Sequence, residues 1–161
     1  MKNGKLSIGL IGAGRAGMIH ARNLRASVPH AALTAVADPV EAAARAACEE
    51  LELERFEILA DETVDAVVVV TPTKYHCEIV LEAARAGKHI LCEKPMAMTV
   101  EECAAMEAET ARCGVKLQMA FMRRFDQSFM QAKRVVDSGA VGDVVMVRSN
   151  TRGPSIPKPW M

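Results

Sequence analysis

The stretch Lys5-Leu-Ser-Ile-Gly-Leu-Ile-Gly-Ala-Gly-Arg-Ala-Gly-Met18 decides the fold that this sequence predicts. Its first part, Leu6–Ile11, is an apolar run with the length of one buried parallel strand. Its second part holds Gly12, Gly14 and Gly17 at the spacing G-x-G-x-x-G. In a dinucleotide-binding turn the first glycine permits the tight turn off the strand. The second lets the backbone approach a pyrophosphate, and the third lets the next helix lie close to the strand.

The helix expected after these glycines supplies the rest of an anion site. Its first N–H groups have no partner within the helix, and its dipole places partial positive charge at this end. Arg15 and Ala16 lie between the second and third glycines, so both are candidate cofactor-binding residues. By itself the glycine spacing is a weak signal, because glycines also recur at this spacing in ordinary turns.

An acidic residue in the right place strengthens the interpretation. A second apolar run, Ala31–Ala37, ends at Asp38, at about the ~20-residue distance from the glycines where a carboxylate binds the adenosine ribose. A carboxylate there repels a 2′-phosphate, so the sequence predicts NAD rather than NADP. The alternative is that Asp38 is only a turn residue before Pro39.

Composition excludes several classes of protein. The chain has 161 residues, half of them hydrophobic, which is enough for one buried core. The formal net charge is zero, so nothing favours binding to nucleic acid or to a membrane surface. The longest apolar run, 66–70, is too short to span a bilayer. The N-terminus leads into a strand without a signal-like apolar region, so we expect a cytoplasmic protein.

The cysteines predict neither a disulfide framework nor a metal site. There are five, an odd number, and none form a C-x-x-C pair. Free thiols in a reducing compartment are the simplest interpretation.

Strands and helices are expected to alternate along the first three quarters of the chain. Apolar runs end at Ile11, Ala37, Val70, Cys92 and about Phe121, and helical segments at about 14–26, 39–51, 73–86 and 99–112 lie between them. Thr73 and Thr99 are the expected N-caps of the last two helices. This alternation predicts an α/β fold, a doubly wound parallel-sheet Rossmann domain over residues 1–121. A third strand after the second helix is expected to be a stub around 51–53, or missing.

The pattern changes after residue 121. A helix is expected at about 127–138 and a further strand at 142–151, before a proline-rich run. One helix and one strand cannot bury a core, so residues 122–161 are expected to be the truncated start of an α+β second domain. The strand would have an unpaired edge, so we expect either a homo-oligomer formed through residues 143–151 or disorder of that segment.

Several motifs together resemble those of the Gfo/Idh/MocA oxidoreductases, and among them most closely those of inositol 2-dehydrogenases and related sugar dehydrogenases. The motifs are the glycine-rich loop, Thr71-Pro-Thr with His76 nearby, Ala86-Gly-Lys-His-Ile-Leu-Cys-Glu-Lys-Pro95, and Met122-Arg-Arg-Phe-Asp126. The resemblance covers essentially the whole chain and is more specific than any one motif.

The resemblance implies roles for particular residues. Lys94 would position and polarise the reacting hydroxyl or carbonyl, and Glu93 would lie beside the nicotinamide ribose. The segment that lines the nicotinamide half of the cofactor would be formed by Thr71, Pro72 and His76, and Arg123 would lie near the nicotinamide and the substrate. The family's acid-base histidine belongs to the second domain and matches no position here, so we expect this chain alone to be inactive.

The residues support this interpretation without the family. A lysine at the carboxyl edge of a parallel sheet can stabilise an alkoxide, although it can also be an ordinary surface lysine. His76 fits helix-start packing as well as it fits a role in the site. The predicted function is the NAD(H)-binding portion of an oxidoreductase that transfers hydride between a sugar or polyol alcohol and nicotinamide. The alternatives are a non-catalytic nucleotide sensor and, more weakly, a methyltransferase-like protein.

Overall fold

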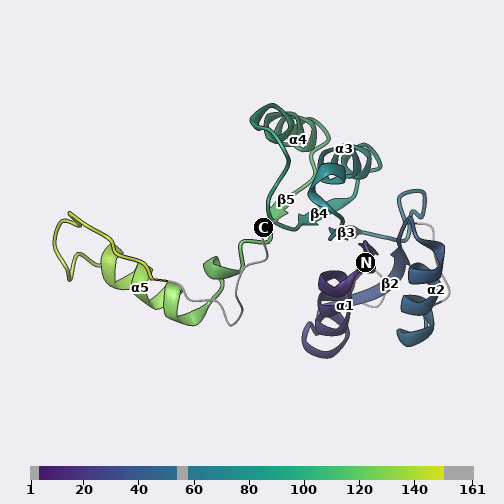
Figure 1. The fold of residues 1–161 in the computed structure, drawn as a ribbon, viewed down its shortest axis with the longest axis horizontal. Coiled ribbons are helices and arrows are strands. Elements are labelled where there is room, and N and C mark those ends of the chain that lie inside the picture. Colours follow the sequence, from purple (N-terminus) through teal and green to yellow (C-terminus); the bar gives the residue numbers. More distant parts are fainter. Residues whose placement is uncertain (1–3, 54–57, 151–161) are drawn as a thin grey trace, which may run out of the picture. The chain divides into compact units, whose positions relative to one another are not determined.

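The computed structural model describes residues 4–53 and 58–150. They fall into two units, one that ends at Phe121 and one that begins at Met122. In the described part of the first unit, five parallel strands form one sheet in the order β2-β1-β3-β4-β5 (Figure 1). The strands are β1 (Leu6–Ile11), β2 (Ala31–Ala37), β3 (Ala66–Val69), β4 (His89–Cys92) and β5 (Leu117–Met119).

Along the chain, an α-helix lies between each strand and the next, together with turns and loops. These helices are α1 (Arg15–Ser27), α2 (Glu41–Glu50), α3 (His76–Arg85) and α4 (Val100–Arg112). The predicted α/β fold with a parallel sheet is therefore confirmed. None of the helices described here is long and apolar enough to cross a membrane.

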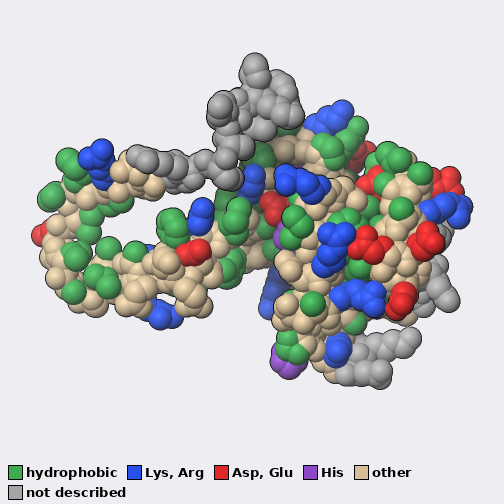
Figure 2. Space-filling view, turned by 60° about the horizontal axis from the view of Figure 1, so that its bottom comes forward, with side chains coloured by type: hydrophobic (Ala, Val, Ile, Leu, Met, Phe, Trp, Pro, Cys, Tyr) green, Lys and Arg blue, Asp and Glu red, His purple; other side chains and the backbone are tan. Residues whose placement is uncertain are grey.

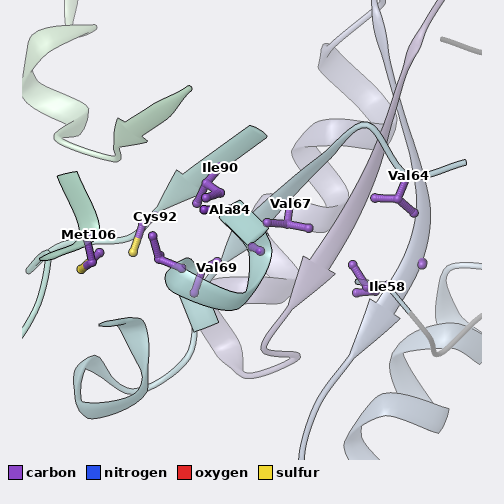
Figure 3. Packing of buried hydrophobic residues seen from close by; sticks show 11 residues of the cluster. Ile58, Val64, Val67, Val69, Ala84, Ile90, Cys92 and Met106 are labelled. Carbon is purple, nitrogen blue, oxygen red and sulfur yellow. The ribbon is translucent and has the colours of Figure 1, made fainter. Parts of the chain in front are cut away.

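Side chains alternate across the sheet, so β3 contributes to two separate cores. Val67 and Val69 pack in a cluster that includes residues of α3, α4 and β4, and Figure 3 shows them with Met106 of α4. Val68 packs in the other cluster, with residues of β1, α1 and α2 such as Ala21. A strand covered on both faces explains why this segment of the sequence is uninterruptedly apolar.

Of the two alternatives expected for the third strand, a stub around 51–53 or no strand, residues 51–53 agree with the second. Leu51 and Glu52 form a turn after α2, and the N–H of Leu53 donates to the Cys48 carbonyl at 2.9 Å. Leu51 is 3% exposed and belongs to the core beside α2. Burial of its side chain therefore favours a turn that ends the helix over an extended strand. Between β2 and β3 the described residues contain no strand, and residues 54–57 lie outside them.

The two predicted helix caps differ in outcome. Thr99 caps α4: its hydroxyl accepts from the N–H of Glu102 at 3.2 Å, and the Glu102 carboxylate accepts from the N–H of Thr99. Thr73 does not cap a helix. It begins a 3₁₀ turn, Thr73–Tyr75, in which the N–H of Tyr75 donates to the Pro72 carbonyl, so a backbone group replaces the side-chain cap.

The second unit contains α5 (Gln127–Asp137), which confirms the helix expected there. Asp126 caps it by accepting from the N–H groups of Ser128 and Phe129. The strand expected at 142–151 is wrong for residues 142–150, which are exposed and form no strand. A strand needs a hydrogen-bonding neighbour, and the described residues offer none here. Hydrophobic side chains accordingly lie on the surface of this unit (Figure 2).

Candidate functional site

The topology of the sheet places a crevice at one particular edge. The chain runs from β1 outward to β2 and then returns to β3 on the other side of β1. The loops after β1 and β3 therefore separate at the carboxyl ends of these strands. In open α/β sheets, this switch point is where ligands bind.

The glycine loop after β1 has the geometry that its spacing predicted. Gly12 has φ +106°, which favours glycine, and a Cβ there would stand 2.6 Å from the Val70 carbonyl oxygen. A Cβ on Gly17 would stand 1.9 Å from the carbonyl oxygen of Gly12. Around Gly14, in contrast, no atom lies within 4 Å of the Cβ position. Two of the glycines thus permit close packing, and Gly14 leaves open space.

The amino end of α1 has no side-chain cap. Gly14 occupies the N-cap position, no side chain bonds to it, and the first turn contains no acidic residue. Arg15 and Ala16 lie in this first turn and are exposed. The helix therefore presents free N–H groups and its positive dipole end at the open space left by Gly14, and such an arrangement suits an anion.

Asp38 is both a turn residue and part of the site. Its Oδ1 accepts from the N–H of Val40, and its Oδ2 accepts from the N–H of Ala13 in the glycine loop, both at 2.8 Å. The carboxylate thus joins the end of β2 to the glycine loop. Each oxygen has a further lone pair, so the group can also accept from a ligand hydroxyl.

A pocket lies beside these groups. Its volume is about 690 Å³, within the range typical of small-molecule sites. The lining is mainly apolar and comes from the glycine loop, the end of β2, the loop after β3 and the start of α3, with Gly14, Asp38, Val40, Thr71 and Ile79 among its residues. An apolar pocket with two acidic residues, Asp38 and Glu78, in its wall suits a flat heterocycle linked to a polyhydroxyl group.

In the segment after β3, some residues line the pocket and another, His76, supports the loop from behind. Thr71 and Pro72 line the pocket. The Thr71 hydroxyl is buried and has no hydrogen-bond partner among the described residues. His76 is 1% exposed, with Nδ1 2.9 Å from the Pro95 carbonyl and Nε2 2.8 Å from the Thr71 carbonyl. Both nitrogens lie within hydrogen-bond distance of backbone carbonyl oxygens, so His76 lies between the loops after β3 and β4 and supports them.

The Glu-Lys-Pro segment follows β4 at the same edge. Lys94 is exposed, and its ammonium forms no hydrogen bond or ion pair with a described residue. The Lys94–Pro95 peptide bond is cis. Behind this turn, burial, followed by the nearby charge of Glu93, raises the pKa of the Cys92 thiol to about 12, so the thiol is not a nucleophile.

Glu93 has a partner that the sequence did not reveal. Its Oε1 lies 2.9 Å from Nε2 of His20, on α1. The two residues are 73 positions apart, so no local spacing pairs His20 with Glu93. The available signal was its position: His20 follows Ala16 by one helical turn, so it lies on the face of α1 that begins at the glycine loop.

Arg123 belongs to the second unit. Its guanidinium lies over the Phe129 ring, 5.2 Å from the centroid, and 3.8 Å from the Asp126 carboxylate. Its expected place beside the nicotinamide and substrate stays a prediction.

Comparisons with known proteins agree with this geometry. The model of an oxidoreductase family with an NAD-binding Rossmann fold matches residues 6–121. A scyllo-inositol 2-dehydrogenase (NAD(+)) of Bacillus subtilis is 39% identical over 153 residues, which are 92% of this chain and 45% of that protein. An inositol 2-dehydrogenase of Saccharopolyspora erythraea is 42% identical, over 94% of this chain and 47% of that protein.

A solved structure shares the fold. The scyllo-inositol dehydrogenase of Lactobacillus casei, crystallised with NAD(H) and scyllo-inositol, superposes with a TM-score of 0.81 at 37% identity, over 86% of this chain and 43% of that chain. This chain thus spans about half the length of the relatives it matches.

Proposed function

Because this chain belongs to the Gfo/Idh/MocA oxidoreductase family, whose model describes an NAD-binding Rossmann fold, we propose that it is the cofactor-binding portion of a polyol dehydrogenase. The complete protein would transfer hydride between a secondary alcohol carbon of an inositol-like substrate and the nicotinamide of NAD. The observation that carries this proposal is the open, uncapped amino end of α1, which lies beside an apolar pocket with a carboxylate in its wall.

Different residues would bind different parts of the dinucleotide. The adenine would occupy the apolar pocket, with its ribose hydroxyls donating to Asp38. The pyrophosphate would lie over Gly14 and accept from the first N–H groups of α1, including those of Arg15 and Ala16. The negative charge of Asp38 would oppose the 2′-phosphate of NADP, so we propose NAD as the cofactor.

Lys94 and Glu93 would serve the reacting end. Nicotinamide, when bound, supplies the carbon that accepts or returns the hydride. The free ammonium of Lys94 would donate to the substrate oxygen and stabilise the negative charge that this oxygen carries once its proton is removed, or once hydride adds to the carbonyl in the reverse direction. Thr71 and Pro72 would form the neighbouring wall, and His76 would hold that wall against the Glu-Lys-Pro segment.

The positions of the histidines support the proposal that this chain alone is inactive, because none of them is a free acid-base group at the site. His20 is bonded to Glu93, and His76 is buried with both nitrogens facing backbone carbonyl oxygens. His30 precedes β2 and His89 begins β4, so both lie at the amino ends of strands, opposite the site. General acid-base catalysis typically contributes about 10²–10⁴-fold to rate. We therefore propose that the chain binds NAD without oxidising polyols at a useful rate.

Calorimetric titration of the 161-residue chain with NAD⁺ and NADH tests cofactor binding. We expect saturable binding of both, and a folded chain that binds neither would overturn the proposal. An absorbance assay at the reduced-nicotinamide band, over a panel of inositols and sugars, tests the second part. Rapid turnover by the chain would show that an acid-base group is present after all.

A further inference from the structure

The pair formed by His20 and Glu93 joins two elements that are distant in sequence. His20 lies in the second turn of α1 and Glu93 follows β4, 73 residues later. Nε2 of His20 and Oε1 of Glu93 are 2.9 Å apart, and the two side chains are 28% and 21% exposed. The pair is therefore at the edge of the site and partly shielded from water.

The second oxygen of the same carboxylate is also engaged. Oε2 of Glu93 accepts from the backbone N–H of Lys94 at 2.9 Å. The carboxylate thus connects the imidazole of His20 to the peptide from which the Lys94 side chain departs. A glutamate bound through both oxygens has few rotamers left, so the chain atoms between the two contacts have little freedom.

The N–H of Glu93 also donates to the Val69 carbonyl of β3 at 2.9 Å, so the sheet and the carboxylate together set the backbone position of Lys94. Its ammonium has no partner among the described residues, so only its backbone limits where the side chain can reach. From the other side, His76 bonds to the carbonyl of Pro95. The Glu-Lys-Pro segment is therefore held at both ends by a histidine, by His20 through Glu93 and by His76 directly.

Attachment of α1 to the sheet does not require the pair. Ala21 is fully buried in the core beside β1, and Gly17 packs against the Gly12 carbonyl. We propose that His20 is a positioning residue that orients Glu93 and, through it, Lys94. This inference rests on the proposed function for its consequence at the cofactor, but its structural part can be tested without any ligand.

The first measurement is the Lys94 amide in the 161-residue chain, by its NMR chemical shift and hydrogen exchange. His20→Leu removes the donor, while His20→Gln keeps an N–H at a similar reach. We expect His20→Leu to shift the amide and raise its exchange rate at least severalfold, and His20→Gln to restore both. His30→Leu, a change at an exposed histidine on the opposite edge, is the matched control. A Lys94 amide unchanged in a folded His20→Leu chain would overturn the proposal.

The second measurement is NADH affinity by fluorescence titration. We expect a severalfold loss in His20→Leu, recovery in His20→Gln, and no further loss when His20→Leu is added to Glu93→Ala, because the effect passes through Glu93. Additive losses would overturn that route. If the folded wild-type chain binds no NADH, the proposed function fails, but the amide measurement still decides the positioning role.

Discussion

Gly17 lies so close to Gly12 that a single carbon atom cannot be added between them. A Cβ at position 17 would stand 1.9 Å from the Gly12 carbonyl oxygen, whereas a Cβ at position 14 would meet nothing within 4 Å. The two glycines of one motif therefore have different reasons to be glycine. Gly17 serves the packing of the protein, and Gly14 leaves room for what the protein binds.

Alanine at these two positions should separate folding from binding. Gly17→Ala should lower the free energy of unfolding by about 3 kcal/mol or more, because the backbone has to move. Gly14→Ala should leave stability within about 0.5 kcal/mol, since its φ of −68° suits any residue. It should nevertheless weaken NAD binding at least about tenfold, or about 1.4 kcal/mol. Chemical denaturation and calorimetry measure both quantities, and equal effects of the two variants would contradict this division.

Asp38 should determine the choice of cofactor. In Asp38→Asn the charge is lost but one oxygen can still accept from the glycine loop, so we expect NADP binding to strengthen relative to NAD by about tenfold. Glu78→Gln removes a charge from the same pocket without touching that loop, and is the matched control. Calorimetric titrations with both dinucleotides give the ratio. If the two variants change it equally, the effect is general electrostatics rather than recognition by Asp38.

Glu109 should make stability depend on acid pH. Hydrogen bonds from Arg112 and then Arg85 lower its pKa from 4.5 to about 2, and Arg85 joins α3 to α4 through it. Because the pKa is lower in the folded state, the stabilisation is present above about pH 4.5 and is lost as the pH falls towards 2.

The difference in melting temperature between the wild type and Glu109→Gln measures this effect. We expect the wild type to melt higher at pH 6 and the difference to disappear near pH 2. Glu107→Gln, on the same helix and without a described side-chain partner, should show no such convergence. A difference that stays constant from pH 6 to pH 2 would rule out a role for the Glu109 carboxylate.

Residues 143–150 should promote self-association even though they form no strand. Val145 and Val147 are 97% and 81% exposed, and water orders unfavourably around such side chains. We expect light scattering to give a mass that rises with protein concentration, and Val145→Lys with Val147→Lys to reduce it. Met98→Lys, at an exposed position of the first unit, is the control. A wild-type chain that stays monomeric at all concentrations would refute the prediction.

The parts of the fold that the sequence predicted are those with local causes. The strand β2 has the bounds of its apolar run, and the capping box of Thr99 and Glu102 formed as its spacing indicated. In the same way, the positive φ of Gly12 could be anticipated from its place in the motif. Thr73 shows the limit of such reasoning. The residue type suited a cap, but the N–H of Tyr75 donates to the Pro72 carbonyl and not to the Thr73 side chain.

By itself, the sequence determined the parallel sheet, the glycine loop and the residues at the carboxyl edge, because periodicity and glycine spacing act over a few neighbouring residues. Only the tertiary structure decided which of these residues meet. His20 faces Glu93 because α1 packs across the sheet, and His76 lies between two carbonyls because the loops after β3 and β4 are adjacent. Such contacts depend on which strands become neighbours, and strand order is a property of the whole packed chain.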